Sequence, residues 1–158
     1  MTEYLPGVYL RGLNDRILEL VPNSLHSDIE CWMEGIELVI NPSHQGRGRD
    51  IGYMTYSGIF SFERFPFKKV NTASVMASVM AWLMDNDAHR EDFELGNPTC
   101  DVEPTSDDTV IMTIEIDFVE PLKVVENPDG DVLWNGKRWS VAEYEIWQAK
   151  HVEVGIKR

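Results

Sequence analysis

The chain has 158 residues, a net charge of −13 at pH 7 and an isoelectric point near 4.6. Its hydrophobic share of 43% is typical of a globular protein and too high for a disordered chain. Because DNA phosphates repel so acidic a surface, sequence-specific binding of duplex DNA is excluded as a first interpretation, although a local basic patch is not.

The sequence predicts a protein that is made and used inside a cell. Residues 1–4 lack the basic region of a signal peptide, and the most apolar stretch, residues 73–84, is too short to span a bilayer, so no membrane partner is expected. The two cysteines, Cys31 and Cys100, are too few for a disulfide framework. We therefore expect reduced thiols, buried as small apolar side chains.

The first part of the chain predicts a helix followed by a long pair of strands. Residues 8–21 place apolar side chains at steps of three and four, which is typical of an amphipathic helix. Residues 28–40 alternate between apolar and polar, and Gly35 interrupts them as a bulge would, switching the faces. The polar residues 41–50 predict a loop, and the aromatic residues 51–65 predict a strand. Together these segments predict a long hairpin arm.

A second helix is predicted for residues 71–86, with Asn71 or Thr72 as its cap. Its core-facing stripe is expected to contain Val75, Val79, Trp82 and Leu83, widened by Met76 and Met80.

The second half of the chain predicts more strands. Residues 93–102 form a weaker strand pattern. Residues 110–118 place an apolar side chain at every second position with mostly polar ones between them, as a strand with one solvated face does. The dipeptide Asn135-Gly136 indicates a type I′ hairpin, and residues 146–156 could be a last strand. One face of the strand at residues 110–118 is expected to carry Val110, Met112, Ile114, Ile116 and Phe118.

This mixture of helices and strands without strict alternation predicts an α+β fold with a mostly antiparallel sheet, two main helices packed on one face and a long hairpin arm. With no internal repeat and no low-complexity linker, residues 1–158 are expected to form a single domain with a C-terminal hairpin extension at about 126–158.

The sequence contains no pattern typical of a catalytic, metal or cofactor site. The four histidines, His26, His44, His89 and His151, have no metal-ligand spacing and are expected at the surface. Glycines 46, 48 and 52 precede a strand rather than a helix, so they offer no aligned amides for a phosphate. The acidic run 101–108 lacks the glycine and acid spacing of a calcium loop. We therefore expect no enzyme and no cofactor.

Two groups of residues instead suggest contacts with other proteins. In so acidic a chain, Arg47 and Arg49 of the polar loop, with Lys68 and Lys69 further on, are local positive spots that suit an acidic neighbour or a passing DNA backbone. Ordinary solubilising charge is the alternative. Three of the five tryptophans lie in the tail and suggest docking onto this domain's own sheet or onto a neighbour. The candidate interface residues are Gln45, Arg47, Arg49, Trp134, Trp139 and Trp147.

Four stretches, in this order and at this spacing, resemble the gpR-type tail completion proteins (tail terminators) of contractile-tailed phages. The resemblance covers roughly residues 8–125 and includes no catalytic motif. The stretches are the helix with Leu10-Arg11-Gly12-Leu13 and the strand Asp28 to Gly35, the aromatic strand Tyr53 to Phe65, the helix with Val79-Met80-Ala81-Trp82-Leu83, and the strand with Thr113-Ile114-Glu115-Ile116.

The resemblance implies a structural virion protein at the head-proximal end of the tail, assembled in the host cytoplasm. Members of this family close the tail tube, and in contractile tails the sheath, with a homo-oligomeric ring, commonly a hexamer. The ring then presents a docking surface to the neck and head completion proteins, and DNA passes through it without sequence-specific binding. The resemblance carries over no cofactor and no catalytic residue.

Two alternatives stay open at this point. The chain could be another neck subunit or a tail tube subunit. A tube subunit would polymerise into long tubes by itself, whereas a terminator should stop at one ring. It could also be a small-molecule-binding α+β domain or an enzyme, which would require a pocket with convergent polar groups.

Overall fold

The computed structural model describes residues 7–45 and 48–142, without the side chains of residues 43–45. In chain order the elements are α1 (Val8–Leu20), the 3-10 helix η1 (Asn23–Asp28), β1 (Ile29–Gln45), β2 (Gly48–Phe65), α2 (Thr72–Asn86), α3 (His89–Asp92), β3 (Thr99–Pro104), β4 (Val110–Glu126), β5 (Val132–Trp134) and β6 (Lys137–Val141).

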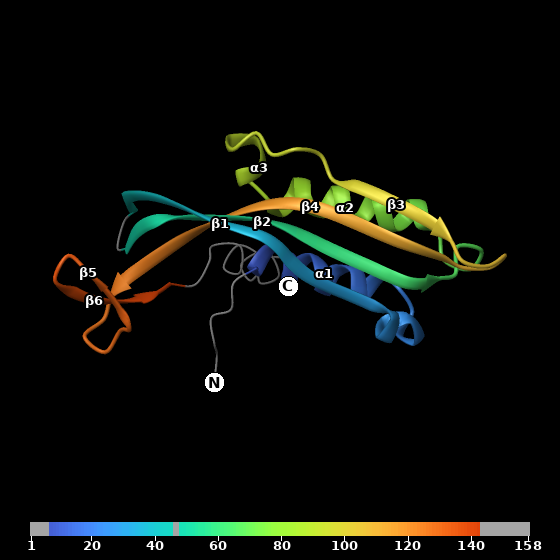
Figure 1. The fold of residues 1–158 in the computed structure, drawn as a ribbon, viewed down its shortest axis with the longest axis horizontal. Helices are drawn as coiled ribbons and strands as arrows, with labels where there is room; N and C mark the ends of the chain where they lie inside the picture. The colour runs from blue at the N-terminus through green and yellow to red at the C-terminus, as the bar shows by residue number, and fades with distance from the viewer. Residues whose placement is uncertain (1–6, 46–47, 143–158) are drawn as a thin grey trace, which may run out of the picture. The chain divides into compact units, whose positions relative to one another are not determined.

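One antiparallel sheet of six strands organises the protein, in the order β1-β2-β4-β6-β5, with β3 paired to β4 beside that path (Figure 1). The register pairs Cys100 of β3 with Ile114 of β4, and Val125 of β4 with Ser140 of β6. The predicted α+β fold class is confirmed.

The structure divides into two compact units, which we name the helical unit, residues 9–36 and 56–119, and the hairpin unit, residues 1–8, 37–55 and 120–158. The long strands β1, β2 and β4 each contribute to both units. Compact units that share strands need not be separate domains, so the single domain over residues 1–158 stays a prediction.

The core of the helical unit is built on the alternating side chains of β4. Val110, Met112, Ile114, Ile116 and Phe118 are all at most 6% exposed, as the alternation predicted. The helix α1 lies on this apolar layer, since its Leu10 and the Phe118 ring both closely approach Gly58 of β2.

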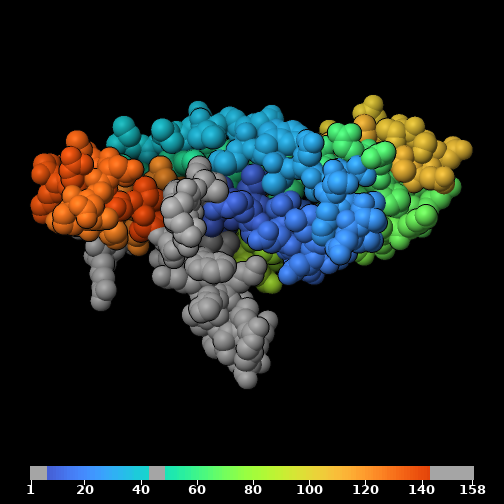
Figure 2. Space-filling model, turned by 90° about the horizontal axis from the view of Figure 1, so that it is seen from below, coloured from blue at the N-terminus to red at the C-terminus, as the bar shows by residue number. Residues whose placement is uncertain are grey.

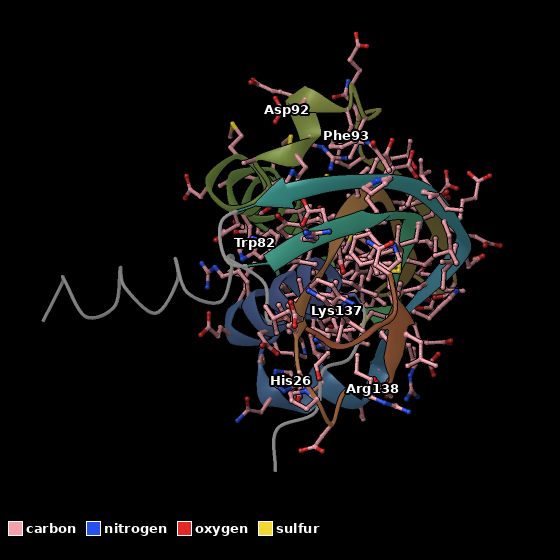
Figure 3. All side chains as sticks on the ribbon, turned by 90° about the vertical axis from the view of Figure 1, so that its left-hand side faces the viewer. His26, Trp82, Asp92, Phe93, Lys137 and Arg138 are labelled. Carbon is pink, nitrogen blue, oxygen red and sulfur yellow. The ribbon has the colours of Figure 1, made fainter. Side chains whose placement is uncertain are left out.

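The two main helices contact each other inside the helical unit. Trp82 of α2, labelled in Figure 3, packs edge-to-face against Tyr9 of α1, with 6.5 Å between the ring centroids. It also lies against Gly12 of α1. The predicted cap is confirmed, because Asn71 Oδ1 accepts hydrogen bonds from the backbone N–H groups of Ala73 and Ser74. The predicted buried stripe of α2 is confirmed for Val75, Val79, Trp82 and Leu83.

A buried ion pair fixes the end of α2. Asp87 is 5% exposed and lies 3.0 Å from Arg90, which also donates to the carbonyl oxygens of Asp117 and Gly96 at 2.9 and 3.0 Å. Burial raises the pKa of Asp87, and the guanidinium of Arg90 opposes that rise. Arg90 is therefore the main group that favours the charged state of Asp87, and His89 contributes less.

Within the hairpin unit, Gly52 allows β1 and β2 to approach closely. A Cβ atom on Gly52 would lie 2.0 Å from the carbonyl oxygen of Val39 and 3.0 Å from the nitrogen of Asn41. The predicted type I′ turn is confirmed, since Asn135 and Gly136 have φ angles of 54° and 71°. The turn before it closes through a 2.8 Å hydrogen bond from Gly130 N–H to the Asn127 carbonyl.

The predicted loop at residues 41–50 is wrong for its described part. β1 continues to Gln45 and β2 begins at Gly48, and residues 46–47 of the predicted loop lie outside the described residues. The reason is that strand pairing uses backbone groups, which polar residues also supply. Gly35 has a φ of 61° inside β1, a local departure from extended strand geometry at the predicted interruption, and the bulge itself stays a prediction.

Three further expectations need correction. The weak strand predicted at residues 93–102 begins only at Thr99, after α3. Cys31 is half-buried and Cys100 exposed, so the expected burial of both thiols is wrong, although both are free cysteines. Met80 is 52% exposed, because its side of α2 does not face the core.

We expect Gly52→Ala to destabilise the protein by about 1–3 kcal/mol, because the new methyl group would overlap the backbone of β1. The matched control is Gly96→Ala, where a Cβ meets nothing within 4 Å, so its effect should be within about 1 kcal/mol. Urea unfolding of both variants measures the difference. Equal midpoints for the two variants would contradict this account of Gly52.

We also expect Arg90→Met to lower the free energy of unfolding by about 3–5 kcal/mol at neutral pH, because it leaves Asp87 buried without its cation. A raised pKa means that the folded state holds the Asp87 proton more tightly than the unfolded state. The loss should therefore shrink as the pH falls from neutral through the raised pKa toward the ordinary value of 3.8.

Urea unfolding across this pH range measures the effect. The double variant Asp87→Asn with Arg90→Met is the control, since it has no buried carboxylate and should show a loss that does not vary with pH. A loss of the same size in the single variant at every pH would contradict the role given to Asp87.

Candidate assembly interface

The outer edge of β1 is the most exposed apolar strand edge of the hairpin unit. β1 ends the strand order, so among the described strands it pairs only with β2. In this unit Leu38 is 72% exposed and Ile40 85% exposed, while Val39 on the opposite face is 36% exposed. In Figure 2 the hairpin-unit part of β1 lies on the surface of the molecule. An exposed strand edge with apolar side chains is suited to pairing with another chain.

The helical unit has an exposed strand edge of its own at β3. All six residues of β3 are exposed, including Val102 at 49%. Two of them, Asp101 and Glu103, are acidic, and none is basic. β3 is therefore a second possible place for strand pairing, but an acidic one.

The outward side of α2 is unusually apolar for a solvated helix. Residues 72–84 contain no charged side chain, although 26% of the whole chain is charged. Met80 and Met84 are 52% and 80% exposed, and the alanines at 73, 77 and 81 are exposed beside them. An exposed surface of this kind is typical of a protein contact.

Three of the six predicted interface residues lie together in the hairpin unit. The guanidinium carbon of Arg49 lies 5.7 Å from the ring centroids of both Trp134 and Trp139, a cation–π arrangement. The two rings are 5.2 Å apart, and Trp139 Nε1 donates a 2.8 Å hydrogen bond to the Trp134 carbonyl. Trp139 is 4% exposed, so its ring packs within this unit.

The other predicted positions are placed less fully. The side chain of Gln45, and Arg47 and Trp147 entirely, lie outside the described residues. An assembly role for these three stays a prediction, as it does for Arg49 and the two clustered tryptophans. Of the lysines considered with them, Lys68 forms a 3.3 Å exposed ion pair with Asp108, which favours an ordinary surface role.

A buried carboxylate that the sequence did not indicate anchors the start of α1. Glu120 is 0% exposed, and its Oε1 accepts hydrogen bonds from the backbone N–H groups of Gly7 at 3.1 Å and Val8 at 3.2 Å. These amides have no acceptor inside the helix, so the carboxylate satisfies them and complements the helix dipole. The sequence signal that could have indicated this buried carboxylate is a glutamate that directly follows the apolar pair Phe118-Val119.

The described histidines have structural surroundings. His26 Nε2 lies 2.8 Å from the Leu18 carbonyl oxygen, at the end of α1, and the ring of His89 packs against Tyr9 and Phe93. In the described part of the chain, no group of three or more histidine, cysteine, aspartate or glutamate residues could hold a metal ion. Among the described helices, none has the length and apolar character needed to cross a bilayer.

The surfaces of this protein thus offer strand edges and apolar patches for association. The sequence matches the family described as P2 phage tail completion protein R (GpR) over residues 8–143. The chain belongs to this family. It is therefore a structural phage tail protein that interacts with other tail proteins in the virion, and its family is not an enzyme family.

A phage relative supports the assignment. An uncharacterized 19.2 kDa protein from the rep-hol intergenic region of Haemophilus phage HP1 is 27% identical over 143 residues, covering 89% of this chain and 86% of the relative. No solved structure matches the chain significantly.

We expect Arg49→Met to destabilise the hairpin unit by about 0.5–2 kcal/mol, because methionine keeps the packing length but removes the cation between two indole rings. The control is Lys137→Met, which removes an exposed ion pair with Glu126 and should cost less than about 1 kcal/mol. Urea unfolding followed by tryptophan fluorescence compares them. A smaller loss of stability for the Arg49 variant than for the Lys137 variant would show that the cation–π contact does not stabilise the unit.

Proposed function

We propose that this protein assembles into a closed ring of six subunits. The ring caps the head-proximal end of the tail tube and, in a contractile tail, the end of the sheath. The ring then gives the neck and head completion proteins their docking surface. The observation that carries the proposal is the outer edge of β1, where Leu38 and Ile40 stand exposed on a strand with one described neighbour. Family membership supplies the location in the tail.

A ring requires head-to-tail contacts, in which each subunit uses two different surfaces. The exposed edge of β1 in the hairpin unit and the apolar outer side of α2 in the helical unit are different surfaces, so the chain offers what such contacts need. A surface that was self-complementary would instead produce a dimer, which could not close around a tube.

The charge of the chain suits a conduit for DNA. With 27 acidic and 14 basic residues, the ring would repel the phosphate backbone on average, so DNA would pass without being held. We propose that much of this negative charge faces the bore or the solvent. A map of the assembled ring with a basic bore would count against this part of the proposal.

The decisive experiment images the purified protein by electron microscopy and weighs it by native mass spectrometry, alone and with uncapped tail tubes. We expect one closed ring of fixed mass, bound to one end of each tube. Long tubes formed by this protein alone would make it a tube subunit instead. A monomer that stays monomeric at high concentration and ignores the tubes would overturn the proposal.

A matched pair of variants tests the surface. Leu38→Glu places a charge on the outer edge of β1 and should abolish ring formation, because the charge would have to be buried at the contact. Leu133→Glu, at a residue of nearly equal exposure (70% against 72%) in β5, should leave the rings intact. Rings of normal mass from the Leu38 variant would exclude this edge from the contact.

A further inference from the structure

We infer that the apolar outer side of α2 in one subunit packs on Leu38 and Ile40 of β1 in the neighbouring subunit, with Met80 beside Leu38 and Met84 beside Ile40. This inference rests on the proposed ring and deepens it, because it states which surfaces of two copies meet and in which direction. A second copy of this chain is then the occupant of both apolar surfaces.

The two surfaces match in the size and spacing of their side chains. Leu38 and Ile40 lie two positions apart in β1, so their side chains share one face about 7 Å apart. Met80 and Met84 lie four positions apart in α2, so they also share one side, about 6 Å apart along the helix axis. All four side chains are at least 52% exposed in the single chain. Each methionine can therefore cover one residue of the strand, and its flexible side chain can adjust to that residue.

The rest of this side of α2 allows a strand to approach closely. Ala73 and Ala77 continue the line of the two methionines toward the start of the helix, and both are exposed. Residues 72–84 carry no charge, so no charged group on this part of the helix would lose its water when a strand covers it.

The charges of the two elements are opposite. β1 carries three glutamates, at positions 30, 34 and 37, and no lysine or arginine. Residues 64–84 carry three basic residues and no carboxylate, and no other stretch of the chain without a carboxylate is as long. Two of these basic residues form exposed ion pairs, whereas Lys69 is exposed and forms none with any described residue. In a chain with a net charge of −13, α2 and the segment before it therefore complement the acidic strand.

The charges also set the direction of the helix along the strand. With Met80 beside Leu38 and Met84 beside Ile40, Glu37 lies on the far side from Asp85, which directly follows Met84. Asp85 then lies toward residues 41–49, which contain two arginines and no acidic residue. The reverse direction would place Glu37 next to Asp85 and bring like charges together.

Other pairs of surfaces suit a ring less well. A β1–β1 contact or an α2–α2 contact uses the same surface twice and would produce a dimer. Asp101 and Glu103 of β3 lie on either side of Val102, so a β1–β3 contact would bring like charges together. The strand predicted at residues 146–156 lies outside the described residues, so it is not among these surfaces. The α2–β1 contact uses a different surface on each copy, as a closed ring requires.

Cysteine cross-linking within the assembled ring tests the inference. Cys31→Ala and Cys100→Ser first remove the native thiols of the full chain. The same chain then carries a cysteine pair, either at positions 38 and 80 or at positions 40 and 84. After oxidation with copper phenanthroline, we expect each pair to link neighbouring subunits, which gives a ladder of covalent oligomers up to the ring size on a denaturing gel. The control pair, at positions 133 and 84, should give no ladder, because Leu133 is 70% exposed but lies in β5.

A charge exchange gives a second readout that does not depend on thiols. Ile40→Glu and Met84→Lys should each lower the population of rings about ten-fold or more, because each buries an unpaired charge at the contact. The double variant places the glutamate of one subunit beside the lysine of the next, so it should recover most of the rings. Leu133→Glu combined with Met84→Lys is the control and should recover none. Urea midpoints close to that of the wild type would show that the single variants still fold.

The outcomes separate this inference from the proposed function. Rings that show the ladder or the recovery support both. Rings of the wild type, with neither the ladder nor the recovery in the variants, overturn the inference and leave the ring. Normal rings of the Met84→Lys variant that no longer bind tail tubes also overturn it, because α2 would then contact the tube protein. A wild-type chain that forms no ring, alone or with tail tubes, overturns both.

Discussion

The alternation of buried and more exposed side chains over residues 110–118 of β4 is the constraint on which the helical unit depends. Its five alternating apolar residues are buried, whereas Glu115 and Asp117 on the other face are exposed. A register slip of one residue would turn both carboxylates into the core, where an unpaired charge costs several kcal/mol. Burial therefore fixes the pairing of β4 with β3, although every residue of β3 is itself exposed. The packing of α1 on Phe118 and Gly58 follows from this register.

Where local periodicity and burial coincide, the sequence predicted the structure well. The helices at 8–21 and 71–86, the cap at Asn71 and the turn at Asn135-Gly136 depend on residues near each other in the chain, so short-range patterns were sufficient. The α+β class followed from the order of these elements. Family membership followed from the order and spacing of several stretches, which the match over residues 8–143 confirms.

The features that sequence alone did not predict depend on contacts between distant residues. The polar residues 41–45 form strand because β2 supplies backbone partners, a contact that composition does not encode. The cluster of Arg49 with two tryptophans joins residues more than eighty positions apart, and Glu120 becomes an N-terminal acceptor only once Gly7 folds beside it. The exposure of Leu38 and Ile40 runs against the usual burial of apolar residues. We attribute it to the proposed subunit contact, because a surface used for association is solvated in the single subunit.

The exposed edge of β1 is also a hazard during synthesis. A newly made chain exposes unpaired backbone N–H and C=O groups at this edge together with the apolar side chains of Leu38 and Ile40. Such an edge can pair non-specifically with other copies of the chain. The three glutamates along the strand act as gatekeepers, since mutual repulsion holds off aggregation until a specific partner arrives. Salt weakens the repulsion between solvated charges, so this protection is smallest at high ionic strength. Aggregation would then compete with tail assembly.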